Sequence, residues 1–166
     1  MTLLFRLCPF DEEPAASMVS AMRAEMAQMY DGLDIDNSSM PKAGPNELGP
    51  PRGRFVVGFD RDGRALCCGG IKRLEGGTCE IKRMYVVPEA RRRGAARALL
   101  EALEDAAREL GYTIARLDTG PRQPWAERMY RGAGYRPIDN STATRSRASS
   151  ARSRSADACG ERRVVR

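Results

Sequence analysis

The stretch from Cys79 to Leu110 constrains the fold of this chain more than any other. Its first part, CEIKRMYVV, has the β-branched and aromatic residues of a strand, and Pro88 ends that strand because proline has no N–H for the ladder. Apolar residues then recur at helical spacing from Gly94 onward, and Gly111 supplies the helix stop. Backbone N–H groups at the helix start, together with the side chains of Arg91–Arg93, predict a site for a polyanion, most simply a pyrophosphate.

This turn matches neither of two widespread phosphate-binding motifs. The G-x-G-x-x-G pattern of dinucleotide-binding proteins is absent, and no Gly-Lys-Ser/Thr sequence follows as it would in a P-loop. An arginine run before a helix is commonly no more than a solvated surface. The turn alone therefore leaves both interpretations open, and its context has to decide between them.

The cysteine and histidine content narrows the chemistry. The chain has 166 residues, enough for one domain, and it contains no histidine, which excludes Ser-His-Asp hydrolases, Cys-His proteases and H-E-x-x-H metalloproteases. Its five cysteines include no C-x-x-C pair, so we expect no metal site. An odd number with one adjacent pair fits a reducing cytoplasm, which is the location we predict. We see no signal peptide and no membrane-spanning run.

The net charge of +6 is concentrated toward the C-terminal end. From residue 139 onward there are seven arginines against three acids. This end is dominated by Arg, Ser and Ala without apolar periodicity, so we expect a folded domain at 1–140 and a disordered tail at 141–166. The abrupt change in composition at about Ser141 also suggests an altered reading frame. Because the tail has no aromatic residue to stack on bases, nucleic-acid binding is not expected.

The apolar patterns predict an α/β chain. Strands are expected at 2–8, 54–60, 65–74, 78–87, 113–117 and 134–138, and helices at about 14–32, 94–110 and 121–132. The helix at 94–110 is expected to carry Glu104 on its charged outer face, and the helix at 121–132 to turn Trp125 inward. The turns at 60–63 and 76–77 join three of these strands into an antiparallel meander. Because the strand at 113–117 follows a crossover helix, we expect it to pair parallel with the strand at 78–87.

Two features of the N-terminal half leave alternatives open. The first helix carries an apolar stripe that we assign to core packing, with an adaptable ligand surface as the alternative; its members are Met18, Val19, Met22, Met26, Met29 and Tyr30. Residues 31–53 form a long irregular segment rich in Pro and Gly. The sequence does not decide whether this segment is a lid over a substrate or a mobile surface loop.

Two short motifs lie in this order of elements. Arg91, Gly94 and Ala96 match R-x-x-G-x-A, and a second motif, A-x-x-M-Y-x-x-x-G-Y, runs from Ala126 through Tyr130 to Tyr135. With these motifs and element order, residues 3–138 resemble the GNAT superfamily of acyl-CoA-dependent N-acetyltransferases. The resemblance implies a mixed, mostly antiparallel central sheet with helices on both faces, splayed at the cofactor site.

The resemblance also implies acetyl-CoA as cosubstrate, without a metal, and residues that would bind it. Backbone groups near Met84, Tyr85 and Val86 would pair with the pantetheine amides. The pyrophosphate would lie on the backbone of Arg92, Arg93, Gly94, Ala95, Ala96 and Arg97, and Arg91 of the same motif is counted among the cofactor-binding residues. Tyr130 would hydrogen-bond or protonate the departing thiolate. Gln123 occupies a position where many members have Asn, and its amide can still contact the cofactor.

Glu80 is the candidate general base, because it lies on the strand lining the acceptor side, where many members have a basic carboxylate. An ammonium substrate must lose a proton before it attacks, and Glu80 could take that proton directly or through water. The alternative is that Glu80 only pairs with Lys82, Arg73 or another cation.

These features predict an enzyme that transfers an acetyl group from acetyl-CoA to a primary amine, in a small molecule or a protein. The acids Asp31, Asp34, Asp36 and Glu47 are compatible with a cationic small molecule. The family normally adds a last strand after the one at 134–138, and here the tail replaces it, which leaves an incomplete sheet edge. That departure favours an alternative function, a non-catalytic acyl-CoA sensor of the same fold. A homodimer is compatible with the sequence.

Overall fold

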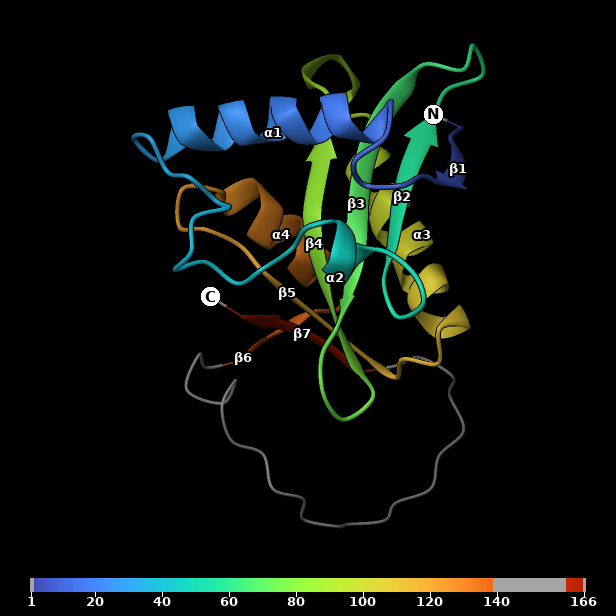
Figure 1. The fold of residues 1–166 in the computed structure, drawn as a ribbon, viewed down its shortest axis with the longest axis vertical. Coiled ribbons are helices and arrows are strands. Elements are labelled where there is room, and N and C mark those ends of the chain that lie inside the picture. Colours follow the sequence, from blue (N-terminus) through green and yellow to red (C-terminus); the bar gives the residue numbers. More distant parts are fainter. Residues whose placement is uncertain (1, 139–160, 166) are drawn as a thin grey trace.

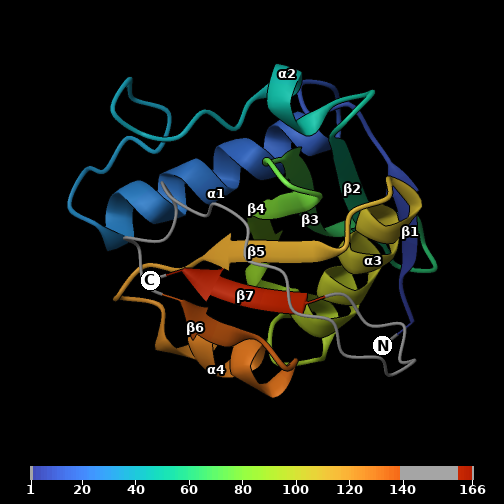
Figure 2. The same cartoon turned by 90° about the horizontal axis from the view of Figure 1, so that it is seen from below.

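The computed structural model describes residues 2–138 and the backbone of residues 161–165. These form a seven-stranded sheet in the order β1-β2-β3-β4-β5-β7-β6 (Figures 1 and 2). The strands are β1 (Leu4–Leu7), β2 (Arg54–Phe59), β3 (Ala65–Arg73), β4 (Thr78–Val86), β5 (Ile114–Asp118), β6 (Arg136–Ile138) and β7 (Glu161–Val165). The helices are α1 (Ala15–Met29), α2 (Pro45–Leu48), the 3-10 turn η1 (Pro88–Ala90), α3 (Ala95–Glu109) and α4 (Pro124–Gly132).

The sheet is mixed, as predicted. Strands β1 to β4 pair antiparallel in chain order, and β5 joins β4 in parallel after the α3 crossover. The meander and the parallel crossover are therefore confirmed, with boundaries that shift by one or two residues. Within the segment at 31–53 the structure adds the short helix α2, which begins at Pro45 and which the apolar pattern did not reveal.

The expectation that the last strand is missing is wrong. β7 lies between β5 and β6 and pairs in parallel with both (Figure 2). The physical reason is that a sheet edge is completed by backbone N–H and C=O groups, which any non-proline sequence supplies, so composition was a poor guide. An altered reading frame at about Ser141 was expected to leave the sheet without this strand. The presence of β7 therefore speaks against that hypothesis. Of the tail at 141–166 that was expected to be disordered, residues 161–165 form β7, and the rest lies outside the described residues.

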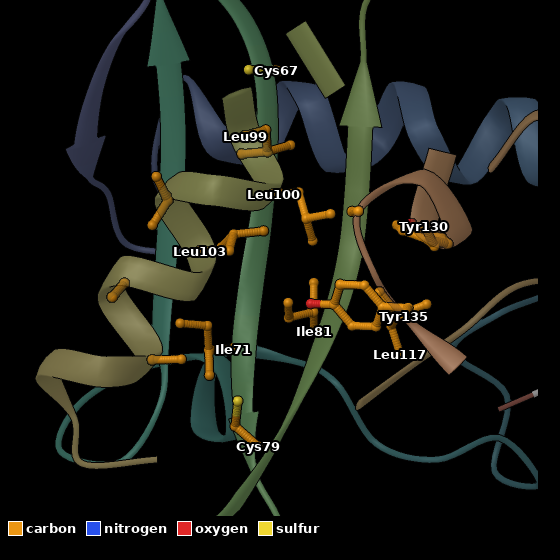
Figure 3. Packing of buried hydrophobic residues seen from close by; sticks show 14 residues of the cluster. Cys67, Ile71, Cys79, Ile81, Leu99, Leu100, Leu103, Leu117, Tyr130 and Tyr135 are labelled. Atoms are coloured by element: carbon orange, nitrogen blue, oxygen red, sulfur yellow. The ribbon is translucent and has the colours of Figure 1, made fainter. Parts of the chain in front are cut away.

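Helices cover both faces of the sheet, as predicted. On one face α3 packs its leucines against β2, β3 and β4, and Tyr130 and Tyr135 lie together toward one end of this cluster (Figure 3). On the other face α1 and α2 pack against β2 and β3. Met18, Val19 and Met22 are buried there, which confirms core packing for that part of the methionine stripe.

Two side chains differ from their predicted environment. Glu104 was expected on the exposed face of its helix but is buried, where the hydroxyl of Tyr135 donates a hydrogen bond to it at 3.0 Å. A buried carboxylate needs such a donor to replace water. Trp125 was expected to face inward, but it is 54% exposed because it lies in the first turn of α4, before the apolar face begins.

Three further findings on the described residues concern membrane spans, metal ligands and thiols. None of the helices found there is long and apolar enough to cross a bilayer. No group of three or more metal-ligating side chains is gathered among residues 2–138. Cys67, Cys68 and Cys79 are buried free thiols, and burial raises the pKa of Cys67 and of Cys79 to about 12. These cysteines pack as small apolar residues and are poor nucleophiles.

Candidate active site

The separation of β4 from β5 defines the site. The two strands pair only from Thr78 with Ile114 to Ile81 with Leu117. β5 ends at Asp118, whereas β4 continues to Val86 while pairing with β3 on its other side. The β5-facing backbone groups of β4 beyond Ile81 therefore have no strand partner among the described residues. An extended chain of amides can pair with such a free edge, as a further strand would.

A β-bulge turns this part of β4. Between the pairs Gly70 with Lys82 and Cys68 with Tyr85, β4 has one residue more than β3. Arg83 takes a φ of 58°, in the left-handed region that side chains other than glycine rarely adopt. A bulge of this kind redirects the strand and reorients the backbone groups that follow. It therefore contributes to the divergence that exposes Met84, Tyr85 and Val86.

The turn before α3 presents backbone donors, as the sequence suggested. The first hydrogen bond into the helix runs from Ala98 N to Gly94 O, so the N–H groups of Ala95, Ala96 and Arg97 have no acceptor within the helix. Gly94 has a φ of 86°, and a Cβ at that position would meet no atom within 4 Å. Open space over unpaired N–H groups at a helix N-terminus is suited to phosphate oxygens.

The arginines of this turn have different roles. Arg92 and Arg93 are exposed and lie beside the helix N-terminus. Arg91 instead points back onto the protein: its Nε donates to Val86 O at 2.9 Å, and its Nη2 lies 2.5 Å from Glu25 of α1. Arg97 pairs with Glu101 and reaches Gly132 O at 3.2 Å. The side chains of Arg91 and Arg97 therefore hold the turn in place, while their backbones remain the predicted phosphate contacts.

Tyr130 lies where α4 meets the free part of β4. It is 7% exposed, and its hydroxyl lies 3.6 Å from the Sδ atom of Met84. Burial, with a smaller contribution from the charge of Asp118, raises the pKa of Tyr130 to about 12. The phenol therefore stays protonated at neutral pH, which is the state that a proton donor needs.

Glu80 lies in a cluster of ion pairs on the opposite face of β4 from Cys79 and Ile81. Its Oε1 is 3.0 Å from Lys82 Nζ, and its Oε2 is 3.8 Å from Lys72 Nζ. Lys82 also donates to Asp118 at 3.0 Å. Burial alone would lower the pKa of Lys82, but Asp118 and Glu80 outweigh it and raise that pKa. The pairing with Lys82 that the sequence offered as an alternative is thus present; Arg73 does not take part.

Sequence reasoning missed the clamp that holds the segment at 31–44. Arg83 donates to Ile35 O at 3.3 Å and to Asp36 at 2.5 Å, and its Nε donates to Ala43 O at 3.4 Å. Asp36 also pairs with Arg23 of α1 at 2.5 Å. In Figure 1 this segment runs from the end of α1, in front of β4, to α2. It covers the face on which Glu80 lies, and no local pattern announces contacts between residues so far apart in the chain.

Gln123 is occupied within the protein. Its Oε1 accepts a hydrogen bond from Gly120 N at 3.4 Å, and its Nε2 lies 3.7 Å from the Sδ atom of Met26. It therefore shapes the turn between β5 and α4. The predicted contact of its amide with the cofactor remains a prediction.

A hollow of about 280 Å³ lies away from these residues, between α3 and Ala133 after α4. Its lining includes Arg97 with Glu101 and Arg108 with Asp105, which are ion pairs within α3. Charged side chains that satisfy one another around an open hollow describe a helix surface rather than a reaction site. We place the site at the free part of β4.

Comparison with known proteins agrees with this geometry. The model of the Acetyltransferase (GNAT) family matches residues 19–135. A relative named IAA acetyltransferase, from Azospirillum brasilense, is 42% identical over 123 residues, covering 70% of this chain and 80% of that protein. An uncharacterized N-acetyltransferase of Schizosaccharomyces pombe is 36% identical over 112 residues, covering 65% and 69%. A crystal structure from Klebsiella pneumoniae, described as an acyl-CoA N-acyltransferase, matches with a TM-score of 0.66 at 26% identity, covering 81% and 83%.

The splayed β4, the open helix N-terminus and the matched relatives together define the class of acyl-CoA N-acyltransferases. Within that class the chain belongs to the GNAT family of acetyltransferases. The resemblance stated from the sequence is thereby confirmed, and with it the GNAT-like fold. The family uses acetyl-CoA, and the unpaired backbone groups described above fit such a ligand.

Proposed function

We propose that this protein transfers an acetyl group from acetyl-CoA to a primary amine. The observation that carries the proposal is the free edge of β4 after Ile81, which lies between the open N-terminus of α3 and the hydroxyl of Tyr130. The edge would pair with pantetheine amides through Met84, Tyr85 and Val86. The backbone from Arg92 to Arg97 would hold the pyrophosphate, with the side chains of Arg92 and Arg93 nearby.

The proposed chemistry is direct transfer. Backbone N–H groups of β4 polarise the thioester carbonyl, and the neutral amine attacks its carbon. A C–N bond forms, the C–S bond breaks, and the leaving thiolate takes the proton of Tyr130. The attacking nitrogen then loses a second proton to become the amide, and this proton restores the Tyr130 phenol, directly or through water. Glu80 accepts the proton that the substrate ammonium must lose, directly or through water. Its Oε2 is the oxygen for this step, because its lysine contact at 3.8 Å is longer than that of Oε1 at 3.0 Å.

Release of free CoA, measured for a panel of small amines and peptides with acetyl-CoA, tests the proposal. We expect acetyl-CoA consumption that depends on the amine, with the acetylated amine confirmed by mass spectrometry. Glu80→Gln keeps the size of the side chain and removes the base, so it should lower kcat most at acidic pH, where the amine is charged. Full activity of Glu80→Gln across the pH range would remove Glu80 from the mechanism.

A second candidate is an acyl-CoA sensor without turnover. The observation that favours it is the double lysine pairing of Glu80, which competes with a role as base. Calorimetry with acetyl-CoA separates the two candidates when combined with the amine panel. Binding of acetyl-CoA without CoA release for any amine would establish the sensor. Location in the cytoplasm and a homodimer remain predictions from the sequence.

A further inference from the structure

A row of charged residues crosses the acceptor face of the sheet. Strand register places Lys72 beside Glu80, Glu80 beside Arg116, and Arg116 beside Arg163 of β7. Residues paired in register share a face, so Lys72, Glu80 and Arg116 lie on the side opposite the apolar cluster of Cys79, Ile81 and Leu117. Two of these three residues are basic, and β5, which carries Arg116, lies between β4 and β7 (Figure 2).

The ion pairs among the described residues of this face do not include Arg116. Lys72 and Lys82 share Glu80, and Lys82 also pairs with Asp118. Arg116 forms no ion pair with any described residue, although Glu80 is its neighbour across the strands. Its Nε is buried and has no hydrogen-bond partner in the described part of the chain. A buried guanidinium donor without an acceptor is costly, so such a group commonly serves a ligand.

A second unpartnered polar atom follows on the same strand end. The hydroxyl of Thr119 is also buried without a partner within residues 2–138. Between the two residues lies Asp118, which shares the face of Arg116 and whose charge reaches Tyr130. Arg116 and Thr119 thus lie two and one positions from Asp118 along the chain. Asp118 pairs with Lys82 in the ion-pair cluster, and its charge acts on Tyr130, the proposed proton donor.

We infer that the amine acceptor carries an anionic group, a carboxylate or a phosphate, which Arg116 binds. This inference rests on the proposed function, since it describes the substrate of the same site. The guanidinium fork pairs with two oxygens of such a group, which places the amine at a fixed distance along the substrate. Glu80 and Asp118 on the same face attract its ammonium end. The acceptor class is therefore an amino acid or a phosphorylated amine.

Matched pairs of acceptors test this with the full chain and acetyl-CoA. Amino acids are compared with their carboxamides, and O-phosphoethanolamine with ethanolamine, which distinguishes carboxylate from phosphate. We expect the anionic member of at least one pair to have the lower KM. Arg116→Gln should raise KM for the anionic member by about 30-fold or more while leaving its neutral partner unchanged. Arg116→Lys should restore part of the preference because it keeps the charge.

The control is Arg73→Gln, since Arg73 is exposed at the end of β3 and its side chain alternates to the other face from Lys72. Circular dichroism melting of each variant establishes that it folds, and Arg116→Lys provides a second variant at the same position. Acetylation of amines without preference for the anionic member would overturn the inference while the proposed function stands. A preference that survives in Arg116→Gln would overturn the role of Arg116. Acetylation of no amine at all would overturn the proposed function and this inference with it.

Discussion

The proposed acetyl-CoA side and the proposed acceptor side of the site are formed by different kinds of contact. The side assigned to acetyl-CoA uses backbone groups and apolar packing: the free edge of β4, the first N–H groups of α3, and Tyr130 against Met84. The side assigned to the acceptor uses ion pairs between distant segments, such as Arg83 with Asp36 and Lys82 with Asp118. Backbone geometry follows from a few short motifs, whereas ion pairs depend on which side chains happen to meet.

This difference predicts how the two sides respond to substitution. A change on the acetyl-CoA side should affect every acceptor equally, because it acts on the shared donor substrate. A change on the acceptor side should alter KM for the amine and leave acetyl-CoA binding intact. A substitution on one side that changed the binding of the other side's substrate would show that the two sides act as a single unit.

Tyr130→Phe should have the largest effect. We expect kcat to fall by about 100-fold for all amines, because the departing thiolate loses its proton donor. Phenylalanine fills the same buried space, so acetyl-CoA binding should be nearly unchanged. Steady-state CoA release at saturating substrates gives kcat, and calorimetry gives the dissociation constant of acetyl-CoA.

The control for Tyr130→Phe is Tyr112→Phe, which removes a hydroxyl that donates to Arg52 O at 2.6 Å, away from the site. It should keep full activity. Equal loss of kcat in both variants would mean that the effect comes from general loosening of the fold rather than from proton transfer.

Arg83→Gln should act on the acceptor side. The arginine is 9% exposed and holds the segment at 31–44 through Asp36 and two carbonyls, so its loss should free that segment. We expect KM for the amine to rise about tenfold, in line with the loss of a charge-assisted hydrogen bond. Steady-state kinetics at saturating acetyl-CoA measure this.

Arg64→Gln serves as the comparison for Arg83→Gln. Arg64 pairs with Glu89 at the surface, where it is 65% exposed, and such pairs contribute little. If Arg83→Gln instead raised KM for acetyl-CoA tenfold and left KM for the amine unchanged, Arg83 and its bulge would belong to the acetyl-CoA side.

Gly94→Ala tests the acetyl-CoA side with a smaller expected effect. Alanine at a φ of 86° should cost about 1 kcal/mol of stability, since left-handed backbone is unfavourable for L residues. The dissociation constant of acetyl-CoA should rise about fivefold, because the added Cβ occupies the space over the helix N–H groups. Gly63→Ala is the matched control, with a φ of 81° and open space in a distant turn. It should lose the same stability and bind acetyl-CoA normally.

The sequence predicted the structural elements of the proposed acetyl-CoA side well because their features are local. The R-x-x-G-x-A turn, the helix that follows and the parallel crossover are specified by neighbouring stretches of the chain, and the structure has all three. Tyr130 was found through its motif, and the structure places it beside Met84, another residue of the predicted set.

The acceptor side was predicted poorly because its features are long-range. Arg83 contacts residues more than 35 positions earlier, and nothing around it in the sequence distinguishes it from other arginines. Glu104 was placed on the exposed face because helical periodicity does not reveal that Tyr135 reaches it. The last strand was missed because backbone pairing does not require an apolar pattern.

The smallest effect concerns pH, and it separates Tyr130 from the base. Burial raises the pKa of Tyr130 to about 12, against about 10 for a phenol in an unfolded chain. The folded state therefore favours the neutral phenol, and the stability this provides is complete below pH about 10 and is lost as the pH rises toward 12. We accordingly expect no alkaline fall in kcat from Tyr130 below pH about 10. Tyrosinate absorbance in a pH titration measures this: Tyr130→Phe should remove the highest midpoint, and Tyr112→Phe a lower one. If kcat falls well below that pH in wild type and the fall disappears in Tyr130→Phe, the phenol ionises more easily than its burial implies, and the acetyl-CoA side is more open to water than its packing indicates.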